Sequence, residues 1–229
     1  MRILALATDY DGTLAEQGRV DGPTIAGLER FRASGRVLIL VTGRELAELL
    51  AVFPRIDLFD RVVAENGAHL YRPADRSERL LADRPPDSFV ETLKARGVAP
   101  ISVGRVVVAT WVPHDATASA VIRESGLDLD VILNKRAVMI LPTGVNKATG
   151  LNHALGELGM NDRDVAGVGD AENDQAFLAA CGLSAAVSNA LPTLKERADF
   201  VTNAGHGAGV VELIDAILAG AFEGRPTAG

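Results

Sequence analysis

The chemistry of this sequence starts from two aspartates that are separated by one residue. Asp9 and Asp11 lie directly after the aliphatic run Ile3–Thr8, and Gly12 and Thr13 follow them. Two carboxylates held this close in a turn repel each other unless a cation neutralises them, and Mg²⁺ accepts oxygen ligands of this kind. The pattern therefore favours metal-assisted chemistry over the alternative, an ordinary turn built from Asp and Gly.

A second polar group follows the second aliphatic run, Val37–Val41. It consists of Thr42, Gly43 and Arg44, which place a hydroxyl and backbone N–H groups at the predicted start of a helix. Such a helix start binds phosphate, because its free N–H groups point outward and the helix dipole favours negative charge. Helix capping by Thr42 explains the same residues equally well.

The third candidate is Lys147, which opens a predicted helix after Gly144, Val145 and Asn146. A cation at a helix N-terminus opposes the helix dipole, so this lysine stands against its local preference. Lysine is also rare here, since four of the 23 basic residues are lysines. The functional interpretation is a counter-charge for a phosphoryl group, and the ordinary alternative is a solvated surface lysine.

The fourth candidate group follows the aliphatic run Val165–Val168. Asp170, Asn173 and Asp174 stand at positions i, i+3 and i+4, so they share one face of a first helical turn. Asp170 is the predicted metal ligand and Asn173 a polar contact, while Asp174 is expected to hold a metal-bound water or Lys147. The alternative is ordinary capping, because acidic residues are common at helix starts.

The elements that must position these residues alternate along the chain. Buried aliphatic runs separated by helical patterns predict βαβ units and a parallel sheet with helices on both faces. In the first third we expect the strands Ile3–Thr8, Val37–Val41 and Val62–Ala64, and the helices Pro23–Ala33 and Glu45–Val52. After Pro142 we expect Lys147–Leu158, Val165–Val168, Asn173–Ala180, Ala185–Val187, Pro192–Arg197, Phe200–Thr202 and Ala208–Leu218, and then a frayed end from Gly220 to Gly229.

A different pattern interrupts this alternation. Its predicted elements, in the order α-β-β-α-β-β, are Asp87–Arg96, Ile101–Val103, Val106–Val112, a helix that ends before Gly126, Val131–Leu133 and Ala137–Leu141. The two pairs of strands are separated by short polar turns, which is typical of antiparallel hairpins. We therefore predict an α/β fold: a Rossmann-like parallel-sheet core formed by residues 1–82 and 143–229, with a small cap inserted at residues 83–142.

Composition narrows the class of protein. The 229 residues carry a net charge of −7 and only 4% aromatic side chains, which argues against nucleic acid as a partner. No apolar run approaches the ~18 residues of a membrane span, and the first one is too short for a signal peptide. The single cysteine, Cys181, excludes an internal disulfide and favours a packing role. We expect a soluble cytoplasmic protein and leave its oligomeric state open.

Taken together and in this order, the four motifs resemble those of the haloacid dehalogenase superfamily of phosphohydrolases. The branch with an α/β cap is the most similar, and it includes Cof-type sugar phosphatases, sucrose-phosphate phosphatase and archaeal phosphoglycolate phosphatase. The resemblance implies that Asp9 is the nucleophile, which forms an aspartyl-phosphate, and that Asp11 is the general acid and base. It also implies phosphoryl or substrate contacts and an Mg²⁺ site. The contact residues are Thr42, Gly43, Arg44, Lys147 and Asn173, and the metal residues are Asp9, Asp11 (through its backbone carbonyl), Asp170 and Asp174.

The expected function is Mg²⁺-dependent hydrolysis of a small phosphate monoester, either phosphoglycolate or a sugar phosphate. An aspartate at position 11 favours a hydrolase over a protein that keeps its phosphoryl group, because it can activate water against the aspartyl-phosphate. Three alternatives stay open: phosphoryl transfer of the phosphomutase kind, a regulatory domain that lost turnover, and a catalytic fragment of a longer protein.

Substrate choice is expected to lie in the cap, because the core motifs contact only phosphate and metal. The candidate cap contacts are Arg105, His114, Asn134, Lys135 and Arg136. If one or two of them point inward, their positive charge favours a substrate that carries a carboxylate. The turn Glu65-Asn66-Gly67 and the four scattered histidines are interpreted as structural.

Overall fold

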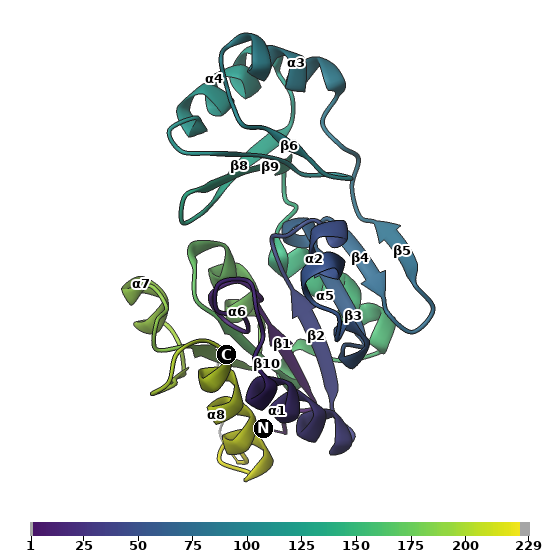
Figure 1. Ribbon diagram of the computed structural model, residues 1–229, viewed down its shortest axis with the longest axis vertical. Coiled ribbons are helices and arrows are strands. Elements are labelled where there is room, and N and C mark those ends of the chain that lie inside the picture. The colour runs from purple at the N-terminus through teal and green to yellow at the C-terminus, as the bar shows by residue number, and fades with distance from the viewer. Residues whose placement is uncertain (1, 225–229) are drawn as a thin grey trace.

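The computed structural model describes residues 2–224, which form two lobes (Figure 1). The larger lobe is built on an eight-stranded sheet with the strand order β12-β11-β10-β1-β2-β3-β4-β5. The strands from β12 to β3 run parallel, whereas β4 and β5 are antiparallel additions at one edge. The strands are β1 (Ala5–Thr8), β2 (Val37–Val41), β3 (Arg61–Ala64), β4 (His69–Arg72), β5 (Ser77–Leu80), β10 (Val165–Gly169), β11 (Leu183–Ala186) and β12 (Phe200–Val201).

Helices cover both faces of this sheet, which is why its central strands are almost continuously apolar. On one face α1 packs against α8, and on the other α5 crosses β2, β3 and β4 and packs against α6. The helices are α1 (Gly22–Ala33), α2 (Leu46–Val52), α5 (Lys147–Leu158), α6 (Gln175–Ala180), α7 (Pro192–Lys195) and α8 (His206–Leu218). Short 3₁₀ turns are η1 (Ile56–Leu58), η2 (Glu65–Gly67), η3 (Asp162–Asp164) and η4 (Glu172–Asp174).

The smaller lobe holds a separate antiparallel sheet with the order β6-β7-β9-β8. Its elements are α3 (Asp87–Ala95), β6 (Ser102–Val103), β7 (Val108–Trp111), α4 (Asp115–Ser125), β8 (Leu129–Asn134) and β9 (Ala137–Pro142). The two helices cover one face and close a small core with Phe89, Leu93, Val121 and Ile140. The other face of the sheet turns toward the larger lobe (Figure 1). We call residues 83–142 the cap.

The predicted fold class is confirmed: a parallel α/β sheet with an inserted α-β-β-α-β-β unit. The division into a catalytic core and a substrate-selecting cap, with boundaries at residues 83 and 142, stays a prediction. The strand expected at Val106–Val112 begins at Val108, because the N–H groups of Val106 and Val107 donate to the carboxylate of Glu65 instead of to a strand partner. The predicted Asn173–Ala180 helix begins at Gln175, after the 3₁₀ turn η4.

The sequence did not predict one hairpin, and it placed the start of the frayed C-terminal end too early. The hairpin β4–β5 was not predicted, since β5 is exposed along its length and lacks the alternation of a half-buried strand. The fraying expected from Gly220 does not start there. Phe222 is buried and its ring stacks edge-on against Phe200, at 5.4 Å between centroids. Residues 225–229 of the predicted frayed end lie outside the described residues. Among residues 2–224, no helix is long and apolar enough to cross a membrane.

Candidate active site

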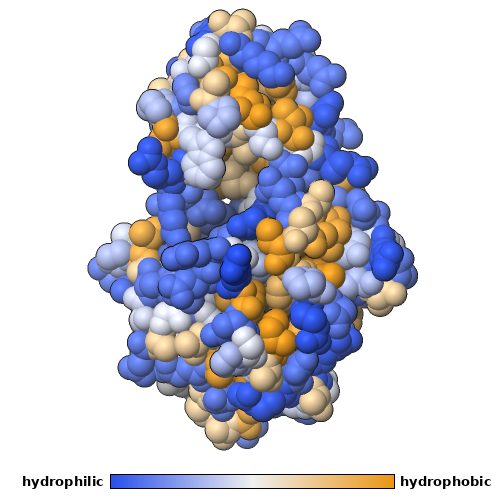
Figure 2. All heavy atoms as spheres, viewed as in Figure 1, coloured by the Kyte–Doolittle hydropathy of each residue, from blue (hydrophilic) through white to orange (hydrophobic). Residues whose placement is uncertain are grey.

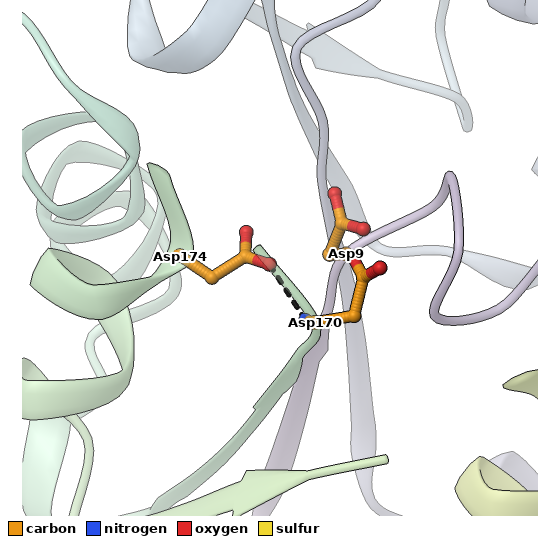
Figure 3. Close-up of side chains that lie close together, drawn as sticks. All are labelled: Asp9, Asp170 and Asp174. Carbon is orange, nitrogen blue, oxygen red and sulfur yellow. Dashed lines mark hydrogen bonds between the residues drawn. The ribbon is translucent and has the colours of Figure 1, made fainter. Parts of the chain in front are cut away.

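The central pair of strands brings two of the predicted acidic residues together. β1 and β10 pair in parallel, and the Asp9 N–H donates to the Val168 carbonyl oxygen at 3.0 Å, just beyond the strands. Asp9 and Asp170 therefore leave the same edge of the sheet from adjacent strands, at the carboxyl ends where α/β sheets bind ligands. Figure 3 shows their carboxylates side by side, with Asp174 facing them from the neighbouring turn.

Lys147 lies between two of these carboxylates. Its Nζ is 2.5 Å from Asp9 Oδ1 and 2.6 Å from Asp174 Oδ1, and its side chain is fully buried. Asn146 caps α5 by accepting the N–H groups of Ala148 and Thr149, so the lysine is held in the first helical turn. Its two carboxylate partners offset the unfavourable helix dipole. The surface-lysine alternative for Lys147 is wrong.

The first turn of α5 rests directly on the backbone of η2. A Cβ atom on Gly67 would lie 1.9 Å from the Asn146 carbonyl oxygen, and one on Gly150 would lie 2.6 Å from the Gly67 Cα. Gly67 also has a φ of +109°, which side chains rarely adopt. Two glycines thus allow the backbone contact that sets the position of Lys147.

Asp174 uses both of its carboxylate oxygens for hydrogen bonds. Oδ1 accepts from Lys147, and Oδ2 accepts the N–H groups of Asp170 at 2.8 Å and Ala171 at 3.0 Å. The bond to Asp170 is the dashed line in Figure 3. Asp174 therefore ties the β10 loop to the lysine, as one of its two predicted roles required.

Asp170 is fully buried, and its carboxylate has neighbours from two segments, the β1 loop and the cap. Thr13 Oγ1 donates to its Oδ1 at 3.3 Å, and Nζ of the cap residue Lys135 lies 2.6 Å from its Oδ2. Gly12 (φ +87°) passes so close that a Cβ there would lie 2.3 Å from Asp170 Oδ2. The glycine after Asp11 is thus required by the close approach of the β1 loop to this carboxylate.

Burial shifts the pKa values of the charged side chains in this cluster. It raises the pKa of Asp9 to about 7; Lys147 lowers this pKa, while Asp174 and Asp170 raise it. Burial also raises the pKa of Asp170. For Lys147, burial lowers the pKa, but Asp174 and Asp9 more than reverse this, so the ammonium stays charged. The buried carboxylates of Asp9, Asp170 and Asp174 face two ammonium groups. One belongs to Lys147 and the other to the cap residue Lys135.

The donor set fits a hard divalent cation. Asp9, Asp170 and Asp174 each offer a carboxylate oxygen, and these oxygens lie within 4.8 Å of one another. Oxygen-only ligands at the end of a buried strand suit Mg²⁺ better than a softer transition metal. A buried acidic triad that can hold a metal ion is therefore present.

Asp11 lies beside this triad rather than in it. Arg44 donates to both Asp11 oxygens, through Nε at 2.5 Å and Nη2 at 2.7 Å, and its guanidinium carbon lies 5.5 Å from the Tyr10 ring centre. The structure thus pairs Arg44, a predicted substrate contact, with the predicted general acid. The other two residues of that motif line the same loop. Thr42 is buried and accepts the Arg44 N–H, and Gly43 lies under Met139 of the cap.

Asn173 turns to the opposite side of the cluster. Its Nδ2 donates to Asn66 Oδ1 at 2.9 Å, while its own Oδ1 and the Nδ2 of Asn66 are buried without a hydrogen-bond partner among residues 2–224. Both residues border a cleft between the cap and the core.

Comparisons with known proteins agree with this geometry. A sequence profile described as haloacid dehalogenase-like hydrolase matches residues 6–103 and 131–214. The chain belongs to this family. The phosphoglycolate phosphatase of Methanothermobacter thermautotrophicus is 32% identical over 92% of this chain and 96% of its own length. That of Aeropyrum pernix is 32% identical over 96% of this chain and 95% of its own length.

A solved structure from Thermoplasma acidophilum shares the fold, with a TM-score of 0.82 at 19% identity, over 95% of this chain and 99% of that one. The family and its relatives make this haloacid dehalogenase-like hydrolase a phosphatase. The resemblance inferred from the four motifs is confirmed at the level of the family.

Sequence reasoning missed what Glu65 does in this hydrolase. The turn was expected to be structural, but the buried Glu65 carboxylate accepts three N–H groups of the cap, from Arg105, Val106 and Val107. A Cβ on Gly104 would lie 2.8 Å from the same carboxylate. The signal available in the sequence was the tripeptide Glu65-Asn66-Gly67. In the structure all three residues have positive φ. Glu65 therefore fastens the cap to the core.

Two clefts flank the site between the cap and the core of the hydrolase, and Figure 2 shows the molecule hollowed at this level. One, of about 580 Å³, lies between β8 and η4 and is bordered by Asn66, Glu172 and Asn173. The other, of about 320 Å³, lies between the start of α2 and the cap sheet and is bordered by Arg44 and the half-exposed Trp111.

Two other cap candidates, Arg105 and His114, have structural partners. Arg105 reaches Glu78 at 3.5 Å, and His114 contacts the Ala99 carbonyl oxygen. The buried His69 lies between Glu65 and Glu78. Burial raises the pKa of the Cys181 thiol, which keeps it neutral and agrees with a packing role. Of the five cap candidates, Lys135 is the one whose charge reaches the acidic cluster.

Proposed function

We propose that the chain is an Mg²⁺-dependent phosphatase that hydrolyses a small phosphate monoester, foremost phosphoglycolate, through an aspartyl-phosphate on Asp9. The observation that carries this proposal is the buried Asp9–Lys147–Asp174 arrangement with Asp170 beside it, at the carboxyl ends of the central strands. The named activity of the relatives supports the choice of substrate.

The first step uses Asp9 as the nucleophile and Asp11 as the acid. An Asp9 carboxylate oxygen attacks phosphorus, and the bond between phosphorus and the leaving oxygen breaks. Asp11 gives its proton to that oxygen, so the alcohol leaves neutral. Arg44 donates to both Asp11 oxygens, so one of these two bonds must open for that oxygen to transfer the proton, while the other bond keeps the carboxyl group oriented, which is a positioning role.

The second step reverses the role of Asp11. It takes a proton from water, the water oxygen attacks phosphorus, and the bond to the Asp9 oxygen breaks, which releases inorganic phosphate. Lys147 supplies positive charge beside the phosphoryl group in both steps, and the buried Thr42, at the carboxyl end of the neighbouring strand β2, is the second proposed phosphate contact. Asp174 holds Lys147 and the β10 loop.

Mg²⁺ would be held by Asp9, Asp170 and the backbone carbonyl of Asp11. When bound, it neutralises charge between the anionic nucleophile and the anionic phosphate. We assign Asp174 to positioning rather than to direct ligation, because three hydrogen bonds already occupy its two oxygens.

The test is a phosphatase screen with 2-phosphoglycolate, hexose and pentose phosphates and nucleoside monophosphates, with Mg²⁺ and with EDTA. We expect the highest kcat/KM for phosphoglycolate, loss of turnover in EDTA and its return with Mg²⁺. Acid-quenched enzyme should carry one phosphoryl group on the peptide that contains Asp9. Full activity in EDTA, or a preference for nucleoside monophosphates, contradicts the proposal. A requirement for a bisphosphate activator would instead indicate a phosphomutase.

A further inference from the structure

Lys135 is a cap residue whose ammonium group lies in the active site of the core. It stands in the turn between β8 and β9, with a φ of +53°. Its backbone N–H donates to Glu172 Oε2 at 3.0 Å, and its Nζ lies 2.6 Å from Asp170 Oδ2. The same nitrogen lies 2.9 Å from the Cβ position of Gly12, so it reaches the nucleophile loop as well.

A metal ion and this ammonium group compete for the same oxygen. Among the described residues, Lys147 makes its ion pairs with Asp9 and Asp174, whereas the ion pair of Asp170 is made by Lys135. A divalent cation on Asp170 would face the Lys135 ammonium at close range, and like charges repel. The lysine side chain is half exposed at 49%, so it has room to move away while Glu172 keeps its backbone in place.

We propose that Lys135 determines substrate specificity: it leaves Asp170 when the metal binds and pairs with a carboxylate on the leaving group of the substrate. This inference rests on the proposed phosphatase function. Phosphoglycolate carries its carboxylate one carbon away from the ester oxygen, so the group stays beside the phosphoryl site. A charge-assisted hydrogen bond from the ammonium stabilises such a substrate, and an uncharged ester leaves the ammonium unpaired.

The other cap cations are less suited to this role. Arg105 lies at the fastening point beside Glu78, and Arg96 pairs with Glu124 on the outer helices. Arg136 follows Lys135 in the same turn, but its side chain is exposed, and among the described residues it has no side-chain hydrogen bond or ion pair. It therefore provides a matched control, because its removal changes the charge of the same turn.

The activity test compares Lys135→Met with Arg136→Met in the presence of Mg²⁺. The quantity measured is the ratio of kcat/KM for 2-phosphoglycolate to kcat/KM for ethyl phosphate, which has the same two-carbon chain with a methyl group in place of the carboxylate. We expect this ratio to fall about 100-fold in Lys135→Met and to stay at the wild-type value in Arg136→Met. Lys135→Arg should recover part of the preference, because it restores the charge.

The second test measures Mg²⁺ binding without substrate by calorimetry. Lys135→Met should bind Mg²⁺ more tightly than wild type, because no ammonium has to be displaced, and Arg136→Met should not differ. Circular dichroism confirms that each variant is folded.

The outcomes separate the two proposals. If wild type hydrolyses both esters without preferring phosphoglycolate, the proposed substrate is wrong. If wild type prefers phosphoglycolate and Lys135→Met keeps that preference, the Lys135 inference alone is overturned. It is also overturned if Lys135→Met loses both esters equally with unchanged Mg²⁺ affinity, since the lysine then only ties the cap to the core.

Discussion

Arg44 holds both carboxylate oxygens of Asp11, through Nε at 2.5 Å and Nη2 at 2.7 Å. Two parallel bonds fix the plane of the carboxylate as well as its place. The two side chains are 26% and 40% exposed, so the pair adds little to stability. Its consequence is the orientation of Asp11 beside the triad.

We therefore expect Arg44→Ala to lower kcat by about 10- to 100-fold with a smaller change in KM, because a misplaced acid slows the reaction after binding. Arg44→Lys should lie between, since a lysine makes a single contact. Steady-state kinetics with Arg136→Ala as the control measures this. A rise in KM at constant kcat would show instead that Arg44 contacts the phosphate, as its place after Thr42 first indicated.

Asp9→Asn should lower turnover by at least ~10⁴-fold, because an amide oxygen is a far poorer nucleophile than a carboxylate. Lys147 keeps Asp174 as a partner, so the variant is expected to fold. Phosphate release measures the effect, and the exposed Asp128→Asn is the matched control. Substantial turnover by folded Asp9→Asn would move the nucleophile elsewhere.

Gly150→Ala should reduce both activity and stability. The new Cβ would lie 2.5 Å from Val63 Cγ1 and 2.6 Å from the Gly67 Cα, and overpacking of this kind costs roughly 1–3 kcal/mol. The strain acts on the helix turn that carries Lys147. Gly156→Ala is the control on the same helix, since nothing lies within 4 Å of its Cβ position. Gly156→Ala should stabilise the protein by up to about 1 kcal/mol, because alanine favours the helix more than glycine does. Thermal unfolding and kcat check both variants, and equal behaviour would contradict the packing argument.

Glu65→Gln should destabilise the protein by about 1–3 kcal/mol at neutral pH, because a side-chain NH₂ would then face backbone N–H donors. Burial raises the pKa of Glu65, but His69 and the cap N–H groups outweigh this, and the pKa is lowered overall. A carboxyl group whose pKa is lowered in the folded state stabilises that state at pH values above its unfolded-state pKa. This stabilisation is lost as the pH falls through the folded-state pKa.

The difference in unfolding free energy between wild type and Glu65→Gln should therefore shrink as the pH falls below about 4.5, the ordinary range for a glutamate. Denaturant unfolding across this range measures it, with the exposed Glu91→Gln as the control. A difference that does not change with pH would mean that packing, and not the ionised carboxylate, fastens the cap.

The sequence predicts the parts of this protein that depend on local signals. Aliphatic runs indicate the buried strands, and a lysine placed against the helix dipole at position 147 indicates an unusual partner. Since parallel strands end at one edge, the approach of Asp9 to Asp170 also follows from the pattern.

Contacts that depend on a side-chain rotamer or on the position of the cap relative to the core could not be predicted from the sequence. Arg44 lies after Thr42 and turns to Asp11, and nothing in its neighbours specifies that rotamer. Lys135 reaches Asp170 only because the cap hairpin meets η4. The sequence shows Glu65 only as part of a turn. Its hydrogen bonds with the N–H groups of residues 105–107 depend on where the cap lies.

Because β1 pairs with β10, the candidate active site can form only after β10 has been synthesised. Thr13 and Asp170 are 157 positions apart, so the β1 loop is synthesised long before the Asp170 carboxylate that it contacts. Until β10 inserts, β1 has an open edge at what becomes the middle of the sheet, a state that invites wrong pairing. A nascent chain that has reached only the end of the cap contains Asp9 but not the complete acidic triad. Under the proposed function, metal binding would therefore be a late event in biogenesis, after the central sheet has closed.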